Sequence, residues 1–297
     1  MTAVAKVEPF HIATLAIVGV GLIGGSFAAA LRQAGCVGRV LGAGRRPQTL
    51  QEAVRLGLID EAVSLDEAAQ RADFIFVAAP VGAFAGIFAG LKPTLNPNAV
   101  LTDGGSTKQN VIEAAREGLK DCIAQFVPSH PMAGSHETGP QAANASLYQG
   151  KRVVLTPLVE NHPQDIERVQ AAWRACGANL VTLDPAQHDA AVAAISHLPH
   201  WVAALYMQHL TQSDDAALKY ALAGSGFRDF TRVAQGSPEM WRDIFEANRQ
   251  AMQTEIATFR KVLERAEHAL NAGDYAYLQD MLEVASQARR DWVSKQS

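Results

Sequence analysis

A run of branched apolar residues that leads directly into closely spaced glycines constrains the fold of this chain more than any other feature. Leu15–Val18 is typical of a buried parallel strand, and Phe27–Arg32 is typical of a helix packed on a sheet. The glycines between them follow the spacing G-x-G-x-x-G, at Gly19, Gly21 and Gly24. In that setting the first glycine allows a tight turn, the second lets a pyrophosphate approach the backbone, and the third lets helix and strand pack closely.

The order of strand, glycine turn and helix predicts a dinucleotide-binding site of the Rossmann type, with phosphates on the unpaired N–H groups at the helix N-terminus. A turn of purely structural importance is the alternative, because glycines recur in many turns. For the binding site, we expect cofactor contacts from the turn and the first helical residues. These are Gly19, Gly21, Leu22, Ile23 and Gly24.

The composition is that of an ordinary globular protein. The chain has 297 residues, of which 48% are hydrophobic and 19% are charged, and this length favours about two domains. Its net charge of -4 gives no general attraction to nucleic acid or to an anionic membrane. The three cysteines, Cys36, Cys122 and Cys176, are scattered and odd in number, so we expect reduced thiols and a cytoplasmic protein.

One apolar stretch has the length of a membrane span. Ile12–Leu31 holds no charged residue and, at about 20 residues, matches the thickness of a bilayer. Gly19, Gly21, Gly24 and Gly25 lie within it and would weaken a continuous helix. We therefore expect no membrane span, and no signal peptide, since no basic region with a cleavage site precedes the stretch.

The end of the second predicted strand, Arg39–Ala43, bears on the choice of cofactor. An NAD site places an Asp or Glu about 20 residues after the glycines, where it binds the ribose 2′-hydroxyl. This chain has Gly44, Arg45 and Arg46 there. A guanidinium can bind a 2′-phosphate through paired charged hydrogen bonds, so we expect NADP to be preferred and NAD to be possible. In this interpretation Arg45 makes the contact and Arg46 supports it, and a solvated arginine pair is the alternative.

Two further apolar runs predict central strands of the same sheet. Asp73–Pro80 is almost uninterrupted until the proline, and Ala99–Asp103 follows a helix predicted over 81–91. Ligands of open α/β sheets bind beyond the carboxyl ends of the strands. We therefore expect Ala79, Pro80 and Val81 to lie beside the cofactor.

The segment after the second of these strands contains a serine with two interpretations. Ser106 follows two glycines and precedes a helical pattern, so it would cap that helix, with Thr107 as the other candidate for the position. Alternatively, its hydroxyl lies over the nicotinamide, because it falls at the carboxyl end of a strand.

A histidine follows the next strand candidate, Ile123–Pro128. His130 would project into the same cleft, and imidazole is the side chain best suited to accept a proton near neutral pH. A histidine at a strand end is often only structural, but its position relative to Ser106 favours catalysis. We therefore predict that His130 and Ser106 are catalytic residues.

The alternation of strands and helices stops near residue 184. Before that point, strands are predicted over Lys151–Pro157 and Asn179–Leu183, around a helix over Gln164–Cys176. From Pro185 onward only helical periodicity remains, including runs over 237–270 and 274–292. The sequence thus predicts an α/β fold, with an N-terminal Rossmann-type doubly wound parallel sheet in a dinucleotide-binding domain over residues 1–184. A C-terminal all-helical domain is predicted over residues 185–297.

Candidate binding residues occur in the helical half as well. His188, His197 and His200 fall on its first helical run, and histidines three residues apart can share a helical face and bind a metal. No cysteine or paired carboxylate completes a ligand set, so we expect no metal, and packing or substrate contact instead. Arg232 would bind a carboxylate bidentately if it is turned inward, or form a structural salt bridge with Asp229.

Six motifs, spread in order over nearly the whole chain, carry a family resemblance. They are Gly19–Ser26, Asp103–Lys108, His130–Gly134, Ser196–His200, Gly226–Arg232 and Met240–Asp243. In these motifs the chain resembles the prephenate and arogenate dehydrogenases of tyrosine biosynthesis. The glycine motif is shared with many dehydrogenases, whereas the histidine motif and those of the helical half are much more specific.

The resemblance implies oxidative decarboxylation of a cyclohexadienol, in which hydride passes from the ring carbon bearing the hydroxyl to the nicotinamide and the ring carboxylate leaves as carbon dioxide. By similarity, His130 accepts the proton of the ring hydroxyl, and Ser106 orients both groups. Arg232 binds a substrate carboxylate, and His200 contacts the substrate side chain. The other substrate-binding residues that the resemblance implies are His197, Ser135, Gly226, Asp229 and Trp241. The family's helical dimerisation domain implies a homodimer.

Two positions depart from the family pattern. Gly44 and Arg45 stand where many relatives have an acidic residue, which supports NADP. His136 stands where we expect an acidic residue, which leaves the charge of the pocket and the choice of substrate open.

Several functions therefore stay open at the level of sequence. Prephenate is favoured over arogenate, which carries an amino group in place of the keto group, and an enzyme acting on both is a further alternative. A reductase of 3-hydroxyacids or imines shares the glycine turn and a helical dimerisation domain, and would use Lys108 or a lysine of the helical half as its acid. A non-catalytic NADP-sensing regulator is the last alternative.

Overall fold

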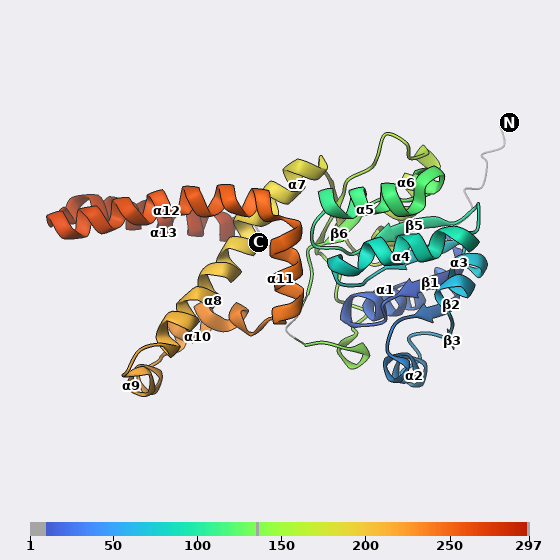
Figure 1. Cartoon of the computed structure of the whole chain (residues 1–297), viewed down its shortest axis with the longest axis horizontal. Helices are drawn as coiled ribbons and strands as arrows, with labels where there is room; N and C mark the ends of the chain where they lie inside the picture. The colour runs from blue at the N-terminus through green and yellow to red at the C-terminus, as the bar shows by residue number, and fades with distance from the viewer. Residues whose placement is uncertain (1–9, 135–136, 296–297) are drawn as a thin grey trace. The chain divides into compact units, whose positions relative to one another are not determined.

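The computed structural model describes residues 10–134 and 137–295 and contains a five-stranded parallel sheet (Figure 1). The strands are β1 (Ile12–Val18), β2 (Val37–Ala43), β3 (Glu61–Ala62), β4 (Phe74–Val77) and β5 (Val100–Asp103). Their order is β3-β2-β1-β4-β5, and every neighbouring pair is parallel. This is the strand order of the Rossmann fold, in which the chain changes its direction across the sheet between β1 and β4.

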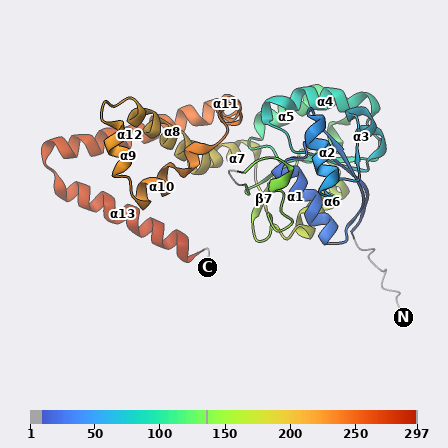
Figure 2. The same ribbon diagram turned by 90° about the horizontal axis from the view of Figure 1, so that it is seen from below.

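Helices cover both faces of this sheet. They are α1 (Leu22–Gln33), α2 (Pro47–Arg55), α3 (Leu65–Arg71), α4 (Phe84–Leu91), α5 (Gln109–Leu119) and α6 (Pro163–Ala175). Figure 2 shows α3, α4 and α5 on one side of the sheet and α1 and α6 on the other. Because both faces are buried, the strands are continuous apolar runs rather than alternating ones.

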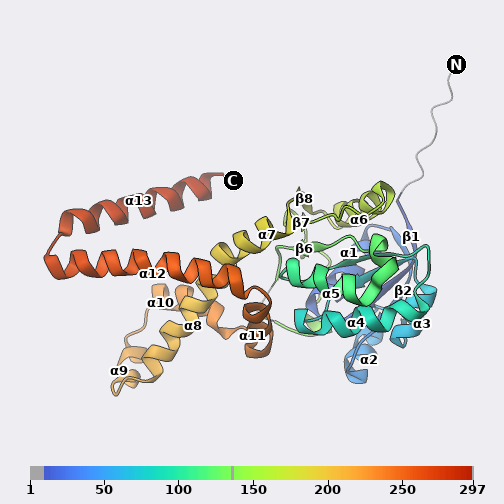
Figure 3. The same ribbon diagram turned by 45° about the horizontal axis from the view of Figure 1, so that its top comes forward.

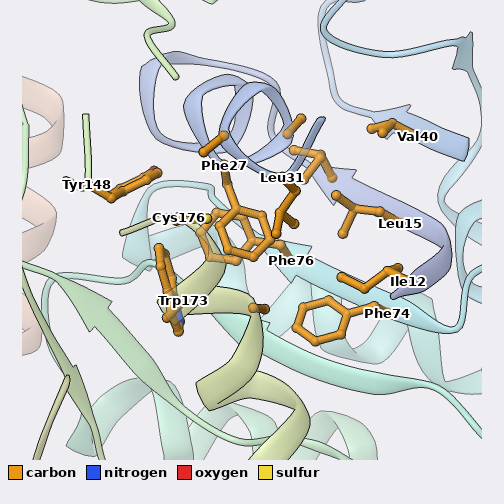
Figure 4. Close-up of a cluster of buried hydrophobic side chains, with 14 of the residues drawn as sticks. Ile12, Leu15, Phe27, Leu31, Val40, Phe74, Phe76, Tyr148, Trp173 and Cys176 are labelled. Carbon is orange, nitrogen blue, oxygen red and sulfur yellow. The ribbon is translucent and has the colours of Figure 1, made fainter. Parts of the chain in front are cut away.

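The core under α1 and α6 is aromatic (Figure 4). The ring of Phe27 lies 4.4 Å from that of Phe76 and 4.7 Å from that of Trp173. Tyr148 meets Trp173 edge to face at 5.1 Å, and its hydroxyl donates to the carbonyl oxygen of Ile23 at 2.6 Å. These contacts join α1, β4 and α6 into one buried cluster.

A second, smaller sheet carries the histidine motif. Its strands are β6 (Ser129–Pro131), β7 (Arg152–Leu155) and β8 (Asn179–Thr182), with β6 antiparallel and β8 parallel to β7. The strand predicted over Ile123–Pro128 is wrong in its first half, which belongs to a 3-10 helix, η3 (Lys120–Gln125). In its second half Phe126 forms a single parallel bridge with Leu101 of β5. The side-chain amide of Asn161 donates to the carbonyl oxygens of Ala124 and Phe126 and so satisfies backbone acceptors of this segment.

The chain after residue 184 is helical, which confirms the predicted fold class. The helical elements are α7 (Pro185–Val192), the π turn η5 (Ala193–His197), α8 (Leu198–Thr211), α9 (Ala216–Ala221), α10 (Ser225–Thr231), η6 (Arg232–Gln235), α11 (Pro238–Ala247), α12 (Arg249–Ala272) and α13 (Tyr275–Ser294). The run predicted over 237–270 is two helices, because Asn248 leaves the helical conformation and its side chain bonds to other elements.

By its internal contacts the chain divides after Arg249 into two compact units. The second unit consists of α12 and α13, two antiparallel helices joined at Gly273, whose φ of 69° permits the tight turn (Figure 3). The first unit contains the sheets together with α7 to α11, because α7 packs on α5. The predicted functional division at residues 184 and 185 stays a prediction.

The stretch Ile12–Leu31 forms β1, the glycine turn and most of α1, as predicted, instead of a membrane span. By length and composition alone, Pro185–Thr211 is apolar enough to cross a membrane, with a mean hydropathy of 1.2. However, the π turn η5 interrupts this run. The part of the run before η5 carries the buried residues His188 and Asp189, whose hydrogen-bond partners lie in β6 and α5. We therefore assign it to the folded helical part of the protein.

We expect Phe27→Ala to lower the free energy of unfolding by about 3–5 kcal/mol, because it opens a cavity between Phe76 and Trp173. The same measurement by urea unfolding on Val159→Ala is the control, since Val159 is 98% exposed and should change stability by less than about 0.5 kcal/mol. Equal effects of the two substitutions would contradict this description of the core.

Candidate active site

A cavity of about 650 Å³ lies at the carboxyl ends of β1, β2 and β4. It is lined by the glycine turn, by the residues after β2 and by those after β4. Of the predicted cofactor contacts, Gly19, Gly21, Arg45, Arg46, Ala79 and Pro80 line this cavity. The other predicted contacts do not line the cavity. Leu22, Ile23 and Gly24 form the first turn of α1, Val81 follows Pro80, and Ser106 follows β5. The structure thus brings the glycine motif and the two arginines to one place.

The three glycines have the geometry that a bound pyrophosphate needs. Gly19 has φ +99°, and a Cβ there would lie 2.4 Å from the carbonyl oxygen of Ala78. A Cβ on Gly24 would lie 2.2 Å from the carbonyl oxygen of Gly19, so α1 packs closely on the turn. Next to Gly21 there is open space instead, and α1 begins there without a side-chain cap or an acidic residue in its first turn. The residues present therefore fit a dinucleotide with its phosphates at the N-terminus of α1.

The end of β2 carries positive charge and no carboxylate. Arg45 and Arg46 are exposed, and none of the ion pairs among the described residues engages either of them. Arg46 immediately precedes α2, whose first turn has no acidic residue, and Thr49 of α2 also lines the cavity. An anionic group at this end of the cavity would meet two guanidinium groups, a hydroxyl and a helix N-terminus.

His130 is the first member of a hydrogen-bonded chain of three side chains. Its Nδ1 lies 2.8 Å from Nε2 of His188, and Nδ1 of His188 lies 2.8 Å from Oδ1 of Asp189. A carboxylate only accepts, so the network assigns the proton of His188 to Nδ1 and makes its Nε2 an acceptor. His130 must then donate from Nδ1, which leaves a lone pair on its Nε2. The chain therefore sets the tautomer that a proton acceptor needs.

The electrostatics around these three hydrogen-bonded side chains favour a neutral His130 and an ionised Asp189. Burial lowers the pKa of His130 well below its ordinary value, and repulsion from His188 and His197 when they are protonated, and from Lys108, lowers it further. Burial alone would raise the pKa of Asp189, but the hydrogen bonds from His188 and from the N–H groups of Gln109 and Lys108 outweigh it and lower the pKa. At neutral pH, His130 can accept a proton, and the negative charge of Asp189 can stabilise the cation that results.

Asp189 also corrects the prediction for the start of α5. The helix begins at Gln109, and the N–H groups of Lys108 and Gln109 donate to the Asp189 carboxylate at 2.7 and 2.9 Å. Neither Ser106 nor Thr107 caps the helix, so the capping interpretation of these residues is wrong, whereas the position of the Ser106 hydroxyl over the nicotinamide stays a prediction. A full negative charge at a helix N-terminus is a stronger acceptor than a hydroxyl, which explains the exchange. Ser106 is half-buried and makes no hydrogen bond to His130 within the described part of the chain.

The second cluster of predicted residues lies in the helical part. His200 stacks on Trp241 with ring centroids 3.6 Å apart, and His197 meets the edge of the same indole at 6.0 Å. The amide nitrogen of Asn248 lies 3.2 Å from Nδ1 of His197 and donates to the main-chain oxygen of Asp189 at 2.8 Å. Gly236 leaves the space for the indole, since a Cβ there would lie 2.4 Å from its Nε1. The histidines His188, His197 and His200 thus have separate partners.

The other predicted substrate contacts lie on the surface of the chain. Gly226 and Asp229 on α10 and Arg232 at the start of η6 are exposed. No ion pair among the described residues joins Arg232 to Asp229, so the alternative of a structural salt bridge is not realised. Ser135 and His136 lie outside the described residues. Sequence reasoning missed the roles of His188, Asp189 and Asn248, although it singled out His188 as one of three histidines.

The cavity, the fold and the histidine chain together define a nucleotide-dependent dehydrogenase, an oxidoreductase. Two sequence models of one family match the chain, described as "Prephenate dehydrogenase, nucleotide-binding domain" over residues 27–182 and "Prephenate dehydrogenase, dimerization domain" over residues 184–284. The chain belongs to the prephenate dehydrogenase family.

Three similar proteins illustrate the range of this family. A prephenate dehydrogenase from Bacillus subtilis is 35% identical over 239 residues, which are 80% of this chain and 64%, less than two thirds, of the relative. A cyclohexadienyl dehydrogenase from Zymomonas mobilis is 32% identical over 281 residues, 93% of this chain and 94% of the relative. The crystal structure of prephenate dehydrogenase from A. aeolicus in complex with hydroxyphenyl propionate and NAD+ matches with a TM-score of 0.90 and 32% identity, over 96% of this chain and 99% of that one.

The buried histidines of the second cluster predict a loss of stability in acid. Burial lowers the pKa of His197 and of His200 from 6.5 to about 4. The unfolded chain therefore binds protons first, so these groups favour the folded state fully above pH 6.5 and progressively less as the pH falls toward 4. Urea unfolding between about pH 7 and about pH 4.5 should show the loss.

His200→Gln should make that loss smaller, because one of the two titrating groups is gone. His162→Gln, on an exposed residue at the start of α6, is the control. The same pH dependence in His200→Gln as in the parent protein would contradict the prediction.

Proposed function

We propose that the protein is a prephenate dehydrogenase. It would oxidise the ring alcohol of prephenate, and the ring carboxylate would leave as carbon dioxide because the ring becomes aromatic, giving 4-hydroxyphenylpyruvate. The observation that supports this proposal most is the tautomer of His130, whose Nδ1 is held by His188 at 2.8 Å and whose Nε2 keeps its lone pair. A neutral imidazole in this state is what the removal of a ring hydroxyl proton requires.

A nicotinamide dinucleotide bound beside Gly21 supplies the hydride acceptor. His130 accepts the hydroxyl proton through Nε2, so that oxidation of the alcohol does not build up a cationic ketone. The positive charge then spreads along the hydrogen bond to His188, and Asp189 stabilises it without taking the proton. In this mechanism His130 touches the substrate, whereas His188 and Asp189 hold the ring of His130 in position.

Substrate binding is proposed for the residues of the helical part. Prephenate carries two carboxylates, and Arg232, exposed and engaged in no ion pair among the described residues, suits one of them. His200 and His197, arranged around Trp241, would contact the substrate side chain, with Gly226, Asp229 and Ser135 as further contacts. Ser106 would orient the ring hydroxyl and His130.

NADP is the cofactor that we propose, with NAD as the alternative. The support comes from Arg45 and Arg46 at the cavity, from Thr49 beside them, and from Gly44 where an NAD site has a carboxylate. The A. aeolicus relative was crystallised with NAD+, so the two cofactors must be compared directly.

Arogenate is the second candidate substrate, alone or together with prephenate. The similarity to the Z. mobilis cyclohexadienyl dehydrogenase supports this candidate. A reductase that uses Lys108 as its acid is disfavoured, because Lys108 is 0% exposed and its Nζ is bound to Asp103. A regulator without activity is also disfavoured, because such a protein would not need a histidine whose tautomer is fixed for accepting a proton.

We further propose a cytoplasmic homodimer. Apolar side chains on α12 and α13 are exposed in the single chain, among them Leu263, Leu282 and Val284 at 58%, 62% and 70%. Several exposed apolar side chains on two neighbouring helices are typical of a face covered by a partner, and the family model that matches this part of the chain is described as a dimerization domain.

The experiment that tests the function follows the formation of reduced cofactor with prephenate and with arogenate, each with NADP and with NAD. Turnover of prephenate with carbon dioxide release is the expected result. Dinucleotide binding without turnover of either compound would refute the proposal and favour the regulator.

His130→Asn should lower kcat by about 1,000-fold while the Kd of the substrate changes little, because the lost interaction forms mainly in the transition state. Single-turnover kinetics and substrate titration separate the two quantities. Exposed His209→Asn in α8 is the matched control. Turnover of His130→Asn near the parent's value would remove this residue from the mechanism.

Arg45→Ala should weaken NADP relative to NAD by about 10-fold to 100-fold in kcat/KM, because a charged hydrogen bond to the 2′-phosphate is lost. Arg55→Ala is the control, since Arg55 lies on α2 but pairs with Glu52 and does not line the cavity. A parent protein that prefers NAD, or an Arg45→Ala variant with unchanged preference, would speak against the NADP site.

A further inference from the structure

A lysine and an aspartate are completely buried at the carboxyl edge of the main sheet, and the proposed mechanism uses neither charge. Lys108, just before α5, and Asp103, the last residue of β5, are both 0% exposed, and their side chains form an ion pair. A buried ion pair contributes little to stability, because the cost of taking both charges out of water offsets their attraction. An apolar pair of similar volume would serve a purely structural purpose as well.

The ion pair holds both peptide groups of Ser129, the residue before His130. Oδ1 of Asp103 accepts the N–H of Ser129 at 2.9 Å, and Nζ of Lys108 donates to the carbonyl oxygen of Ser129 at 2.6 Å. Among the described strands, β6 pairs with β7 and not with β5, and the segment just before β6 meets β5 where the N–H of Val127 donates to the carbonyl oxygen of Leu101. Together with the Ser129 hydroxyl, which donates to the main-chain oxygen of Asp103, the two charged side chains extend this attachment to the start of β6 and fasten the strand of His130 to the edge of the sheet.

The main chain of the same lysine fastens the second histidine. The N–H of Lys108 donates at 2.7 Å to Oδ1 of Asp189, the atom that also binds Nδ1 of His188. Lys108 thus reaches His130 through its side chain and His188 through its backbone. Lys108 therefore holds the surroundings of both imidazoles, whose mutual hydrogen bond of 2.8 Å sets the tautomer of His130.

We propose that Lys108, with Asp103 as its counter-ion, is a positioning residue for the proton acceptor and holds His130 against His188. This inference rests on the proposed function of His130.

The charge of Lys108 acts on His130 together with a small number of other groups. His188 faces the imidazole from α7 and His197 from η5, and the nearby carboxylates Asp103 and Asp189 are each bound to a partner. Burial is the main cause of the low pKa of His130, and repulsion from Lys108, and from His188 and His197 when they are protonated, adds to it. If the lysine charge is removed, the imidazolium is repelled less, so the pKa of His130 rises and the acidic limb of kcat/KM moves to higher pH.

Two variants separate the position of His130 from its charge. Lys108→Met removes both the charge and the donor to Ser129, and kcat should fall by about 100-fold, as expected when a reacting group is misplaced by about 1 Å. Lys108→Gln keeps an N–H donor and removes only the charge, so kcat should fall less while the acidic limb moves by the same amount. Lys92→Met is the matched control, since Lys92 pairs with Asp121 at the surface.

The readouts are kcat, KM, the Kd of NADP and the titration of the His130 ring by NMR, assigned with His130→Asn. The Kd of NADP should not change, because neither Lys108 nor Asp103 lines the cofactor cavity. A parent-like kcat and a parent-like His130 titration in Lys108→Met would overturn the proposal. So would a loss of NADP binding parallel to the loss of activity, since that pattern indicates a general structural role.

If Lys108→Met does not fold, Lys108→Gln decides, and an unshifted His130 titration in it overturns the inference. The NMR titration needs no substrate. A parent protein that turns over no cyclohexadienol would therefore refute the proposed function, while the shift in the variants would still test the role of the lysine.

Discussion

The structure around the candidate site depends on one buried carboxylate. Asp189 accepts hydrogen bonds from the ring of His188 and from the N–H groups of Lys108 and Gln109. A buried charge is tolerated only when it is fully bonded, and these donors meet that condition from two elements at once. The same interaction therefore begins α5, joins α7 to it and sets the direction of the hydrogen bond to His130.

The nucleotide-binding half was predictable because its signals are local. Gly19 and Gly24 lie at positions where a Cβ would collide with backbone, and their spacing alone indicates such a turn. The strands β1 and β4 are continuous apolar runs because α1 and α4 bury opposite faces of the sheet. Arg45 and Arg46 follow β2 directly, so their place at the cavity follows once the strand is recognised.

The histidine chain was only half predictable because its partners are distant in sequence. His130 could be placed at a strand end, but Lys108 and Asp189, which organise its surroundings, are 81 residues apart, and no local pattern links them. The cap considered for Ser106 or Thr107 is absent for this reason, since the remote carboxylate of Asp189 accepts the N–H groups at the start of α5 in place of a local hydroxyl. The first half of the strand predicted over 123–128 is a 3-10 helix instead, and Asn161, which is distant in sequence, bonds backbone oxygens of this segment in a way that periodicity does not reveal. In each case a hydrogen bond from a residue that is distant in sequence determines the local structure, and the local sequence pattern does not reveal it.

The π turn η5 has a consequence for how the helical segment can vary. In α-helical geometry each residue advances the helix by about 100°, and a π turn accommodates one residue more than an α turn does. His188 lies before this turn and His197 and His200 lie at or after it, so the turn takes up one extra residue between the two groups of histidines. Five residues of a π turn rotate the chain by about the same angle as four residues of an α-helix, so a single deletion within Ala193–His197 would give a regular helix and leave everything beyond it nearly in phase. The turn is therefore the place where this helical segment can change its length by one residue without reorienting the histidines beyond it.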